Sequence, residues 1–341
     1  METKLNQFIQ HALTSQPISG TSLIISLYGD ALHHRGGEVW LGSLTNLLEP
    51  MGFTDRFVRT SVFRLQKEGW LDAEKIGRRS YYRISERGQN QFRHAESKIY
   101  QSEQPNWDGK WDLLLLEAAD KDEKARLKKE LSWLGFGQFS TSLMAAPSSA
   151  QSDIPSLLNE LNASEEVIYF RADYPYNRSE KHLKELVSDS WSLQQVAEHY
   201  HQFIVLFRPL ALLLKELSDE QITPEQCFQL RLLLIHFYRR VVLKDPLLPD
   251  ELLPAQWEGQ IARNLCINIY QRVEVAATRY VSEICETTVG ELPQPTTTYF
   301  PTFWRCIKRD RGINLLKYRC NLNRRGTQYA FLSDRWHHAS C

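Results

Sequence analysis

Residues 54–85 read TDRFVRTSVFRLQKEGWLDAEKIGRRSYYRIS, and this stretch decides how the first third of the chain folds. Thr54 is a good N-cap residue for a helix, and Gly69 stands where a helix that begins there would end. After the glycine, residues 70–76 and 80–85 have the composition of strands, and residues 77–79 (GRR) join them. The stretch therefore predicts a helix followed by a β-hairpin.

The predicted helix over residues 54–68 has two faces of opposite character. At 100° per residue, Val58, Val62 and Leu65 lie within about 60° of one another and form an aliphatic face. The opposite arc carries side chains that can reach base edges and phosphates in a major groove, namely Arg56, Arg59, Thr60, Arg64 and Lys67. This pattern predicts a DNA-recognition helix, and the sequence leaves an ordinary amphipathic surface helix open as the alternative.

The tip of the predicted hairpin is basic. Arg78 and Arg79 lie where the wing of a winged helix reaches the phosphates or the minor groove. We expect both arginines to contact DNA, and we add Tyr81 on the second strand to the same set. Contacts of this kind contribute affinity that depends on salt more than on base sequence.

Residues upstream supply the remaining parts of a winged helix-turn-helix. The apolar run from residue 21 to about residue 33 predicts a buried helix, and residues 38–40 are extended in character. Residues 41–49 repeat Leu with the spacing of a helix that has one buried face. Helix, helix, turn, helix and hairpin is the element order of a winged helix-turn-helix, which we expect within residues 1–100.

Composition divides the rest of the chain into four parts. Residues 101–109 are a polar linker, and residues 110–178 alternate strand-length apolar runs with helical segments, as in a ferredoxin-like domain. Residues 179–300 keep helical spacing and predict an all-helical domain for effector binding and dimerisation. Residues 301–341 form a basic, cysteine-containing tail. The predicted fold class is α+β, with a winged helix, a middle ferredoxin-like α/β domain and a C-terminal helical domain.

Composition and charge limit the function classes. Residues 51–98 contain 11 Lys and Arg against 6 Asp and Glu, whereas residues 101–286 contain 19 against 28. A basic module on an acidic body favours a polyanionic partner for the module. The apolar runs are too short to cross a membrane. The six cysteines have no framework spacing, so we expect reduced thiols and a cytoplasmic protein.

Five segments together resemble the PaaX family of phenylacetate-operon repressors. They are TSLIISLYGDALHHRGGEVWLGSLTNLLEPMGF, RFVRTSVFRLQKEGWL, GRRSYYRISERG, WDGKWDLLLLE and DPLLPDELLPAQWEGQIARNL, and the similarity covers about residues 15 to 300. The resemblance implies a homodimeric repressor that binds double-stranded operator DNA, an imperfect palindrome. It also implies a middle domain similar to the ferredoxin-like subunit of CRISPR integration complexes. The implied inducer is phenylacetyl-coenzyme A rather than free phenylacetate, and no cofactor is implied.

An acyl-coenzyme A site needs basic side chains beside aromatic and apolar walls. The acidic body offers these types in one segment and its surroundings, and our hypothesis assigns the effector site to His236, Arg239, Arg240, Lys244 and Trp257. The alternative is that Arg239 and Arg240 pair with acidic residues of the proline-rich loop at 245–254 and fix that loop. A regulator of another aromatic catabolic operon, responsive to a different acyl-coenzyme A, also stays open.

Enzymatic activity is not expected. The sequence has no P-loop, no GxSxG elbow, no HExxH and no paired CxxC. Asp112 and Glu117 flank the first strand of the middle domain, so a metal-dependent nuclease that uses a ferredoxin-like domain is a remote alternative. His33 and His34 are expected to be a surface pair rather than metal ligands, and no metal site is predicted.

Overall fold

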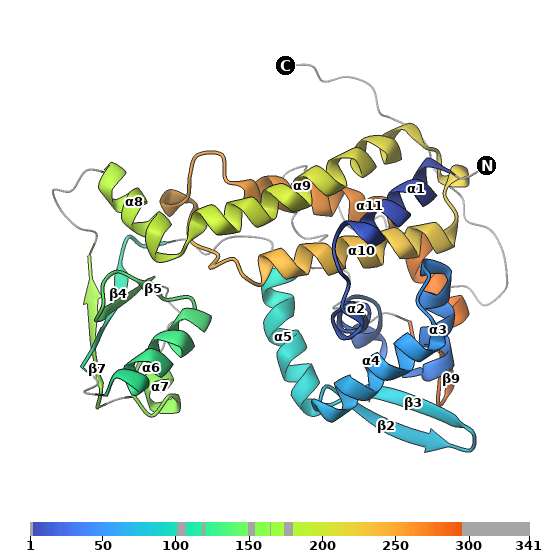
Figure 1. Cartoon of the computed structure of the whole chain (residues 1–341), viewed down its shortest axis with the longest axis horizontal. Coiled ribbons are helices and arrows are strands. Elements are labelled where there is room, and N and C mark those ends of the chain that lie inside the picture. The colour runs from blue at the N-terminus through green and yellow to red at the C-terminus, as the bar shows by residue number, and fades with distance from the viewer. Residues whose placement is uncertain are drawn as a thin grey trace, which may run out of the picture.

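A computed structural model of the chain describes residues 3–100, 107–117, 120–148, 154–163, 165–173 and 180–294. Most of these residues are helical, and three small sheets complete the structure (Figure 1). The predicted fold class, α+β, is confirmed. The predicted tail at 301–341 and most of the predicted linker at 101–109 lie outside the described residues.

The N-terminal part combines helices with a three-stranded antiparallel sheet in the order β1-β3-β2. Its elements are α2 (Gly20–Leu27), two short helical turns η1 (Tyr28–Leu32) and η2 (His33–Arg35), β1 (Glu38–Trp40), α3 (Leu41–Leu48), η3 (Glu49–Met51), α4 (Asp55–Lys67), β2 (Leu71–Ile76), β3 (Arg79–Ile84) and α5 (Glu86–Tyr100). These bounds agree closely with the elements that the sequence predicts from residue 21 onward. The hairpin β2–β3 projects from the body at the lower edge of the molecule in Figure 1.

The middle part has a four-stranded antiparallel sheet in the order β5-β6-β4-β7. Its elements are β4 (Trp111–Leu116), α6 (Lys121–Trp133), β5 (Gly137–Gln138), β6 (Leu143–Pro147), α7 (Ile154–Glu160) and β7 (Val167–Ala172). Side chains of α6 and α7 pack on the sheet in a small separate core. Strands β5 and β6 form a hairpin, because the N–H groups of Phe139 and Ser140 both donate to the Leu143 carbonyl and turn the chain.

The helical body consists of α8 (Glu180–Ser190), α9 (Leu193–Glu216), α10 (Pro224–Val242) and α11 (Glu258–Ile284), with short turns η4 (Asp219–Gln221) and η5 (Asp250–Leu252). Helix α10 is buried along most of its length, because α9 and α11 cover it from one side and α2 and α5 from the other. Three cysteines in or next to these helices, Cys227, Cys266 and Cys285, are buried and free. No described helix is long and apolar enough to cross a membrane.

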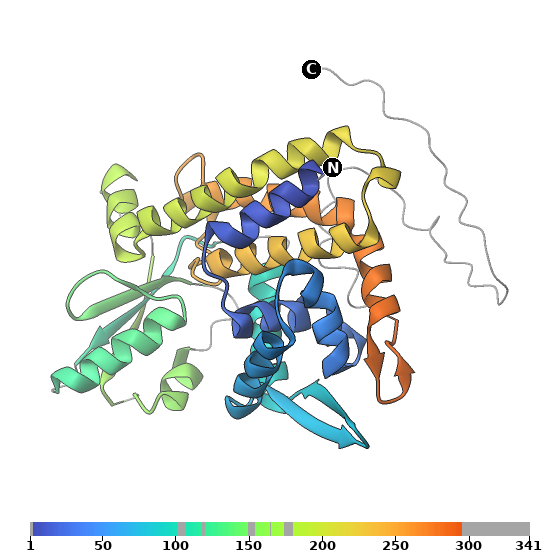
Figure 2. The same cartoon turned by 45° about the vertical axis from the view of Figure 1, so that its right-hand side comes forward.

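Helix α1 (Lys4–Ser15) belongs to this body rather than to the winged-helix part in which the sequence analysis placed it. It packs on α9 and α10 (Figures 1 and 2). The ring of Phe8 lies 5.7 Å from that of Phe207, and the Gln226 side chain donates to Asn6 Oδ1 at 2.7 Å. The apolar face of α1 therefore packs on the body. The prediction that residues 1–100 form one domain is wrong for this helix.

A second difference lies at the end of the body, where the expected all-helical segment finishes in a hairpin of β8 (Glu286–Thr287) and β9 (Gly290–Glu291). This C-terminal hairpin lies beside β1 and continues from the end of α11, which packs on α3 (Figure 2). Gly290 has φ 106°, a conformation that favours glycine, and it allows the tight turn. The body thus reaches the N-terminal sheet through its last residues.

A buried ion pair joins the N-terminal part to the body. Asp30 in η1 accepts hydrogen bonds from Arg231 Nε of α10 at 2.7 Å, Tyr100 Oη of α5 at 2.9 Å and Tyr270 Oη of α11 at 3.0 Å. The Asp30 and Arg231 side chains are both 3 % exposed. The Arg231 guanidinium also donates to Thr278 Oγ1. One carboxylate therefore connects four elements that are far apart in the sequence.

We predict that Arg231→Met destabilises the chain by about 3–5 kcal/mol, because it leaves the Asp30 carboxylate buried without its cation. Urea unfolding followed by circular dichroism measures the change. Arg126→Met is the matched control, since Arg126 pairs with Glu123 and Glu130 on the exposed face of α6. We expect the control to unfold like the unmodified chain. Equal effects of the two substitutions would contradict the role assigned to the buried pair.

Candidate nucleic-acid interface and interdomain cavity

Helix α4 is held by an N-cap and by its aliphatic face. Thr54 Oγ1 accepts a hydrogen bond from the N–H of Phe57, as expected of an N-cap. Val58, Val62 and Leu65 are at most 1 % exposed, and the helix packs on α2, α3 and β2. Because this back face is fixed, the opposite face of α4 is presented to solvent in one orientation.

That opposite face is exposed and basic. All five residues predicted for it have exposed side chains, namely Arg56, Arg59, Thr60, Arg64 and Lys67. Arg59 pairs with Asp55 one turn earlier, whereas Arg56 and Arg64 have no acidic partner within the described part of the chain. Phe63 is 54 % exposed on the same face, and the Lys67 ammonium lies 4.9 Å from its ring centroid. Exposed cations beside an exposed aromatic ring suit a polyanion with apolar groups, such as the thymine methyls of DNA.

The two arginines of the hairpin tip differ in their surroundings. Arg78 is exposed and makes no ion pair with the described residues. Arg79 forms an ion pair with Glu286 of the C-terminal hairpin, and its guanidinium lies 4.4 Å from the centroid of the Trp40 ring. Tyr81 is only 7 % exposed, so we leave it out of the candidate surface. Sequence reasoning missed Glu286 because it lies about 200 residues away along the chain.

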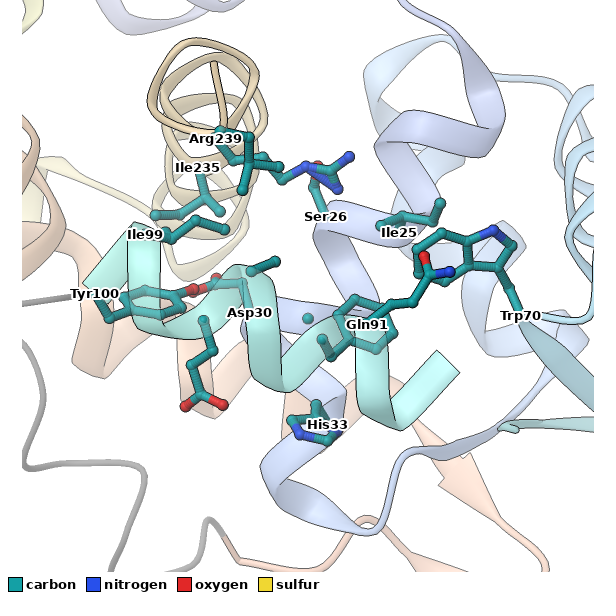
Figure 3. Close-up of a pocket in the computed structure, with 15 residues that line it drawn as sticks. Ile25, Ser26, Asp30, His33, Trp70, Gln91, Ile99, Tyr100, Ile235 and Arg239 are labelled. Carbon is teal, nitrogen blue, oxygen red and sulfur yellow. The ribbon is translucent and has the colours of Figure 1, made fainter. Parts of the chain in front are cut away.

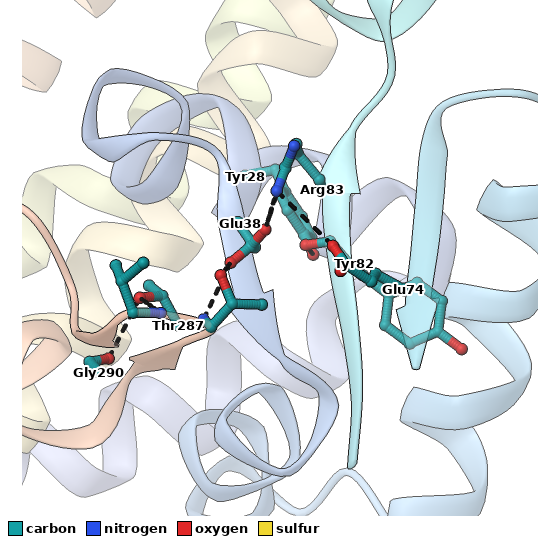
Figure 4. Close-up of polar contacts among 9 residues, drawn as sticks. Tyr28, Glu38, Glu74, Tyr82, Arg83, Thr287 and Gly290 are labelled. Carbon is teal, nitrogen blue, oxygen red and sulfur yellow. Dashed lines mark hydrogen bonds and ion pairs between the residues drawn. The ribbon is translucent and has the colours of Figure 1, made fainter. Parts of the chain in front are cut away.

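Glu38 on β1 links the two hairpins (Figure 4). Its carboxylate accepts hydrogen bonds from the Thr288 N–H at 2.9 Å and the Thr288 hydroxyl at 2.5 Å, and it pairs with Arg83 on β3. Burial alone would raise the pKa of Glu38, but the hydrogen bonds from Thr288 and Arg83 outweigh it and lower the pKa. The C-terminal hairpin is therefore held to the β2–β3 hairpin through an ionised carboxylate.

A cavity of about 70 Å³ lies where the N-terminal part meets the body (Figure 3). Helix α2 and η1 supply one wall, α5 supplies a second and α10 supplies a third. The walls are mainly apolar and aromatic, and they include Ile25, Trp70, Phe92, Ile99 and Ile235. Mainly apolar walls with a small number of polar groups are usual in a binding site for a small organic ligand.

Two polar side chains of α10 lie at this cavity or directly behind it. The Nδ1 atom of His236 lies 3.2 Å from Ser26 Oγ, and its Nε2 atom is buried without a hydrogen-bond partner. Burial, followed by the nearby Arg239 and Arg240, lowers the pKa of His236 to about 3, so its ring is neutral. The Nε atom of Arg239, which lines the cavity, is also buried without a partner. Burial lowers the pKa of Arg239 to about 10, which leaves it charged at neutral pH.

The five residues predicted for the effector site do not converge. Arg239 lines the cavity and His236 lies buried beside Ser26, whereas Arg240 and Lys244 are exposed. Trp257 lines a different, smaller cavity, together with Tyr200, Tyr238 and Asp245. A helix separates neighbouring residues by 100°, which is why adjacent arginines on α10 have different surroundings.

The alternative interpretation of the two arginines is wrong. Neither Arg239 nor Arg240 pairs with an acidic residue of the proline-rich loop in the described structure. Asp245 instead accepts hydrogen bonds from Tyr200 Oη and from the Leu247 N–H, each at 2.7 Å. The loop is therefore fixed by a buried tyrosine, and Arg239 is left without a carboxylate partner.

Two other predictions concern acidic and histidine side chains. Asp112 is 1 % exposed and accepts a hydrogen bond from Tyr169 Oη at 2.9 Å. This contact between neighbouring strands gives the buried carboxylate a structural role. His33, His34 and Glu96 place donor atoms within 4.8 Å of one another, and His34 Nε2 lies 2.8 Å from Glu96 Oε1. The prediction that no metal binds this chain stays a prediction.

Comparisons with known proteins show which families and proteins this chain is similar to. Three family models match the chain, "PaaX-like protein" over residues 19–88, "PaaX protein central Cas2-like domain" over 104–184 and "PaaX-like protein C-terminal domain" over 191–283. The transcriptional repressor PaaX of Escherichia coli strain K12 is 58 % identical over 301 residues, which cover 88 % of this chain and 95 % of that protein. The solved structure of the uncharacterized protein Rv0674 from Mycobacterium tuberculosis has a TM-score of 0.46 and 21 % identity, and the match covers 69 % of this chain and 90 % of that one.

A basic helix and hairpin on a helical body, together with this close relative, place the chain in the class of transcription regulators. Within that class, the chain belongs to the PaaX family. The resemblance that the sequence analysis drew from five segments is confirmed.

We predict that Glu38→Gln destabilises the chain at pH 7 by about 1.5–3 kcal/mol, the range for hydrogen bonds to a charged group. Since the pKa of Glu38 is lowered in the folded state, this contribution is present above the unfolded value of about 4.3. It is lost as the pH falls through the lower folded value. Urea unfolding of both proteins from pH 7 to pH 3.5 should therefore show a difference that shrinks at acidic pH.

Glu74→Gln is the matched control, because Glu74 is exposed and lies 3.9 Å from the same Arg83. Its substitution should produce no such pH-dependent difference. A Glu38→Gln effect that stays constant down to pH 3.5 would show that the charge of Glu38 contributes nothing.

Proposed function

We propose that the chain is a DNA-binding transcriptional repressor of phenylacetic acid catabolic genes. Phenylacetyl-coenzyme A releases this repressor from its operator. The exposed basic face of α4 carries this proposal, because Arg56 and Arg64 hold their charge toward solvent without an acidic partner among the described residues. The name of the E. coli relative supports repression, and the family resemblance supports the catabolic genes and the inducer. The chain acts as a regulator and not as an enzyme.

In this proposal α2, α3, α4 and the β2–β3 hairpin work as a winged helix-turn-helix. Helix α4 enters the major groove, where Arg56 and Arg64 read guanine edges and Lys67 and Thr60 contact phosphates. Arg59 joins them after it leaves Asp55, which lies on the same exposed turn. Arg78 at the hairpin tip contacts a phosphate or the minor groove of the flanking DNA.

Arg79 has a different part in DNA binding. Its ion pair with Glu286 competes with any phosphate that it approaches. An arginine of this kind contributes to DNA affinity only when the C-terminal hairpin gives it up. The position of the C-terminal hairpin therefore affects how tightly the β2–β3 hairpin binds DNA. Through this effect, the DNA affinity depends on the helical body.

Two copies of the chain, related by a two-fold axis, place their α4 helices in successive major grooves of an imperfect palindrome. Homodimerisation rests on the family resemblance. Release follows if phenylacetyl-coenzyme A binds better to an arrangement of the two winged helices that does not match the spacing of the half-sites. Only such a difference in affinity shifts the equilibrium between the two arrangements.

We predict different effects for two substitutions on the DNA-binding surface. Arg64→Ala should weaken binding to the operator by about 1–3 kcal/mol while binding to random DNA changes less, because a base contact is lost. Arg78→Ala should weaken binding to both DNAs alike and lower the salt slope by about one. Fluorescence anisotropy with labelled operator and random duplexes, at several salt concentrations, measures both effects.

Lys75→Ala on the outer side of β2 is the control for loss of one positive charge near the wing. If Arg64→Ala and Arg78→Ala weaken operator and random DNA equally, the division between base and phosphate contacts is wrong. If none of the three changes DNA affinity, α4 is an ordinary surface helix and DNA binding by this face is excluded.

We further predict that phenylacetyl-coenzyme A releases the chain from the promoter DNA upstream of the phenylacetate catabolic genes, and that phenylacetate or coenzyme A alone does not. A gel shift with each compound added in turn measures this. Other acyl-coenzyme A thioesters test the acyl group. A shift that no thioester releases would keep the DNA-binding proposal and exclude the inducer.

A further inference from the structure

The cavity between α2, α5 and α10 has no part in the proposed DNA contacts (Figure 3). At about 70 Å³, it is several times larger than the roughly 10–15 Å³ that a single water molecule needs. Gln91 is an exposed residue on its lining, so the cavity borders solvent. A small organic group can therefore enter without unfolding of the surrounding helices.

The lining combines apolar side chains with the guanidinium group of Arg239. Phe92 and Ile99 of α5 are at most 8 % exposed, and Ile25 of α2 faces them across the cavity. The side chain of Arg239 reaches from α10 toward Ser26 of α2 (Figure 3). Its Nε atom is buried without a partner in the described structure. A buried donor without an acceptor is costly and marks a place where a ligand oxygen is expected.

Nearby acidic groups do not satisfy this arginine. The Asp30 carboxylate lines the same cavity but already accepts hydrogen bonds from Arg231, Tyr100 and Tyr270. Glu96, at another point of the lining, lies 2.8 Å from His34. Neither carboxylate of the lining therefore pairs with Arg239, and its Nε atom is available to a ligand oxygen.

We infer that this cavity binds an arylacetyl group, with the aromatic ring between Phe92 and Ile25 and the acyl oxygen accepting a hydrogen bond from Arg239. The inference rests on the proposed function, because it gives a binding site to the effector named there. The same chemistry is offered by two sources, a thioester whose remaining part extends into solvent, and a free carboxylate. Trp70, Ser26 and Ile235 complete the contacts of the bound group.

A ligand in this position lies at the junction that controls DNA binding. It contacts α2, which packs on the recognition helix α4, and α10, which is the centre of the body. The Cβ atom that a side chain would add at Gly20 of α2 would lie 2.7 Å from the Phe57 ring of α4, which shows how closely the two helices meet. A change in the separation of α2 and α10 is therefore passed to α4 through packed side chains.

Isothermal titration calorimetry on the full chain tests the site with three probes, phenylacetyl-coenzyme A, phenylacetate and coenzyme A. Arg239→Gln should weaken binding of the arylacetyl probe by about 10-fold or more, because a charge-assisted hydrogen bond is lost. The exposed neighbour Arg240 provides the matched control, and Arg240→Gln should change the affinity by less than about threefold. Ala95→Phe, which fills the cavity from α5, should abolish binding.

The two sources are distinguished by the probes. Arg239-dependent binding of phenylacetyl-coenzyme A alone identifies the thioester, and Arg239-dependent binding of phenylacetate identifies the carboxylate. Equal binding of coenzyme A alone, or full affinity in both Arg239→Gln and Ala95→Phe, would overturn the site. A fluorescence change on binding that persists unaltered in Trp70→Phe would also overturn it, because Trp70 lines the cavity.

Operator binding by each variant, measured without ligand, separates this inference from the proposed function. Arg239→Gln should bind the operator like the unmodified chain and should resist release by the effector. Ala95→Phe fills the cavity permanently, so the effector should no longer change its operator binding. If the unmodified chain is released but both variants are released equally well, the repressor proposal stands and the cavity is not the effector site. If the arylacetyl probe binds in an Arg239-dependent way but does not release DNA, the site stands and the release mechanism fails.

Discussion

The carboxylate of Asp30 is the group on which the arrangement of the chain depends. It lies 3 % exposed between four elements, and burial of such a charge is unfavourable unless donors surround it. Arg231 supplies the opposite charge, and the hydroxyls of Tyr100 and Tyr270 satisfy Asp30 Oδ1. Because these donors come from α5, α10 and α11, the charge is compensated only when the N-terminal part sits in one place on the helical body. Apolar packing alone would tolerate small shifts that this geometry does not.

A second connection lies at the other side of the N-terminal sheet, and its charged groups Arg35 and Glu38 are also buried, at 3 % and 7 % exposed. Arg35 donates to the Pro293 carbonyl at 2.7 Å and to Ser282 Oγ at 2.7 Å, and Glu38 accepts from Thr288. The ion pair between Arg79 and Glu286 lies near these contacts and is exposed, so solvent and salt weaken it more than the buried contacts. The body therefore holds the N-terminal part through buried contacts of Asp30, Arg35 and Glu38 and through the exposed Arg79–Glu286 pair. A rotation of the N-terminal part on the body would break this exposed pair more readily than the buried contacts.

Local patterns explain what could be predicted from the sequence. The cap at Thr54, the aliphatic spacing of Val58, Val62 and Leu65, and Gly69 after the helix all lie within residues 54–69, so α4 follows from its own residues. The exposure of Arg56 and Arg64 follows from the same periodicity. The partners of Arg79 and Asp30 do not, because they come from residues 70 to 240 positions away and depend on how α5, α10, α11 and the C-terminal hairpin return to the N-terminal part. The same reason explains why α1 was assigned to the wrong part of the chain.

The effector hypothesis shows the limit of residue types without geometry. His236, Arg239, Arg240 and Lys244 have suitable chemistry, but α10 and the turn after it point them in different directions, and only Arg239 lines the cavity. The aromatic side chains of the cavity wall are Phe92 and Trp70, which lie in the segment predicted to bind DNA. Since Asp30 and Tyr100 line the same cavity, a bound ligand would touch the residues that position the two parts. The cavity therefore shares its lining with the contacts of Asp30, and a ligand bound there would act on both parts of the chain.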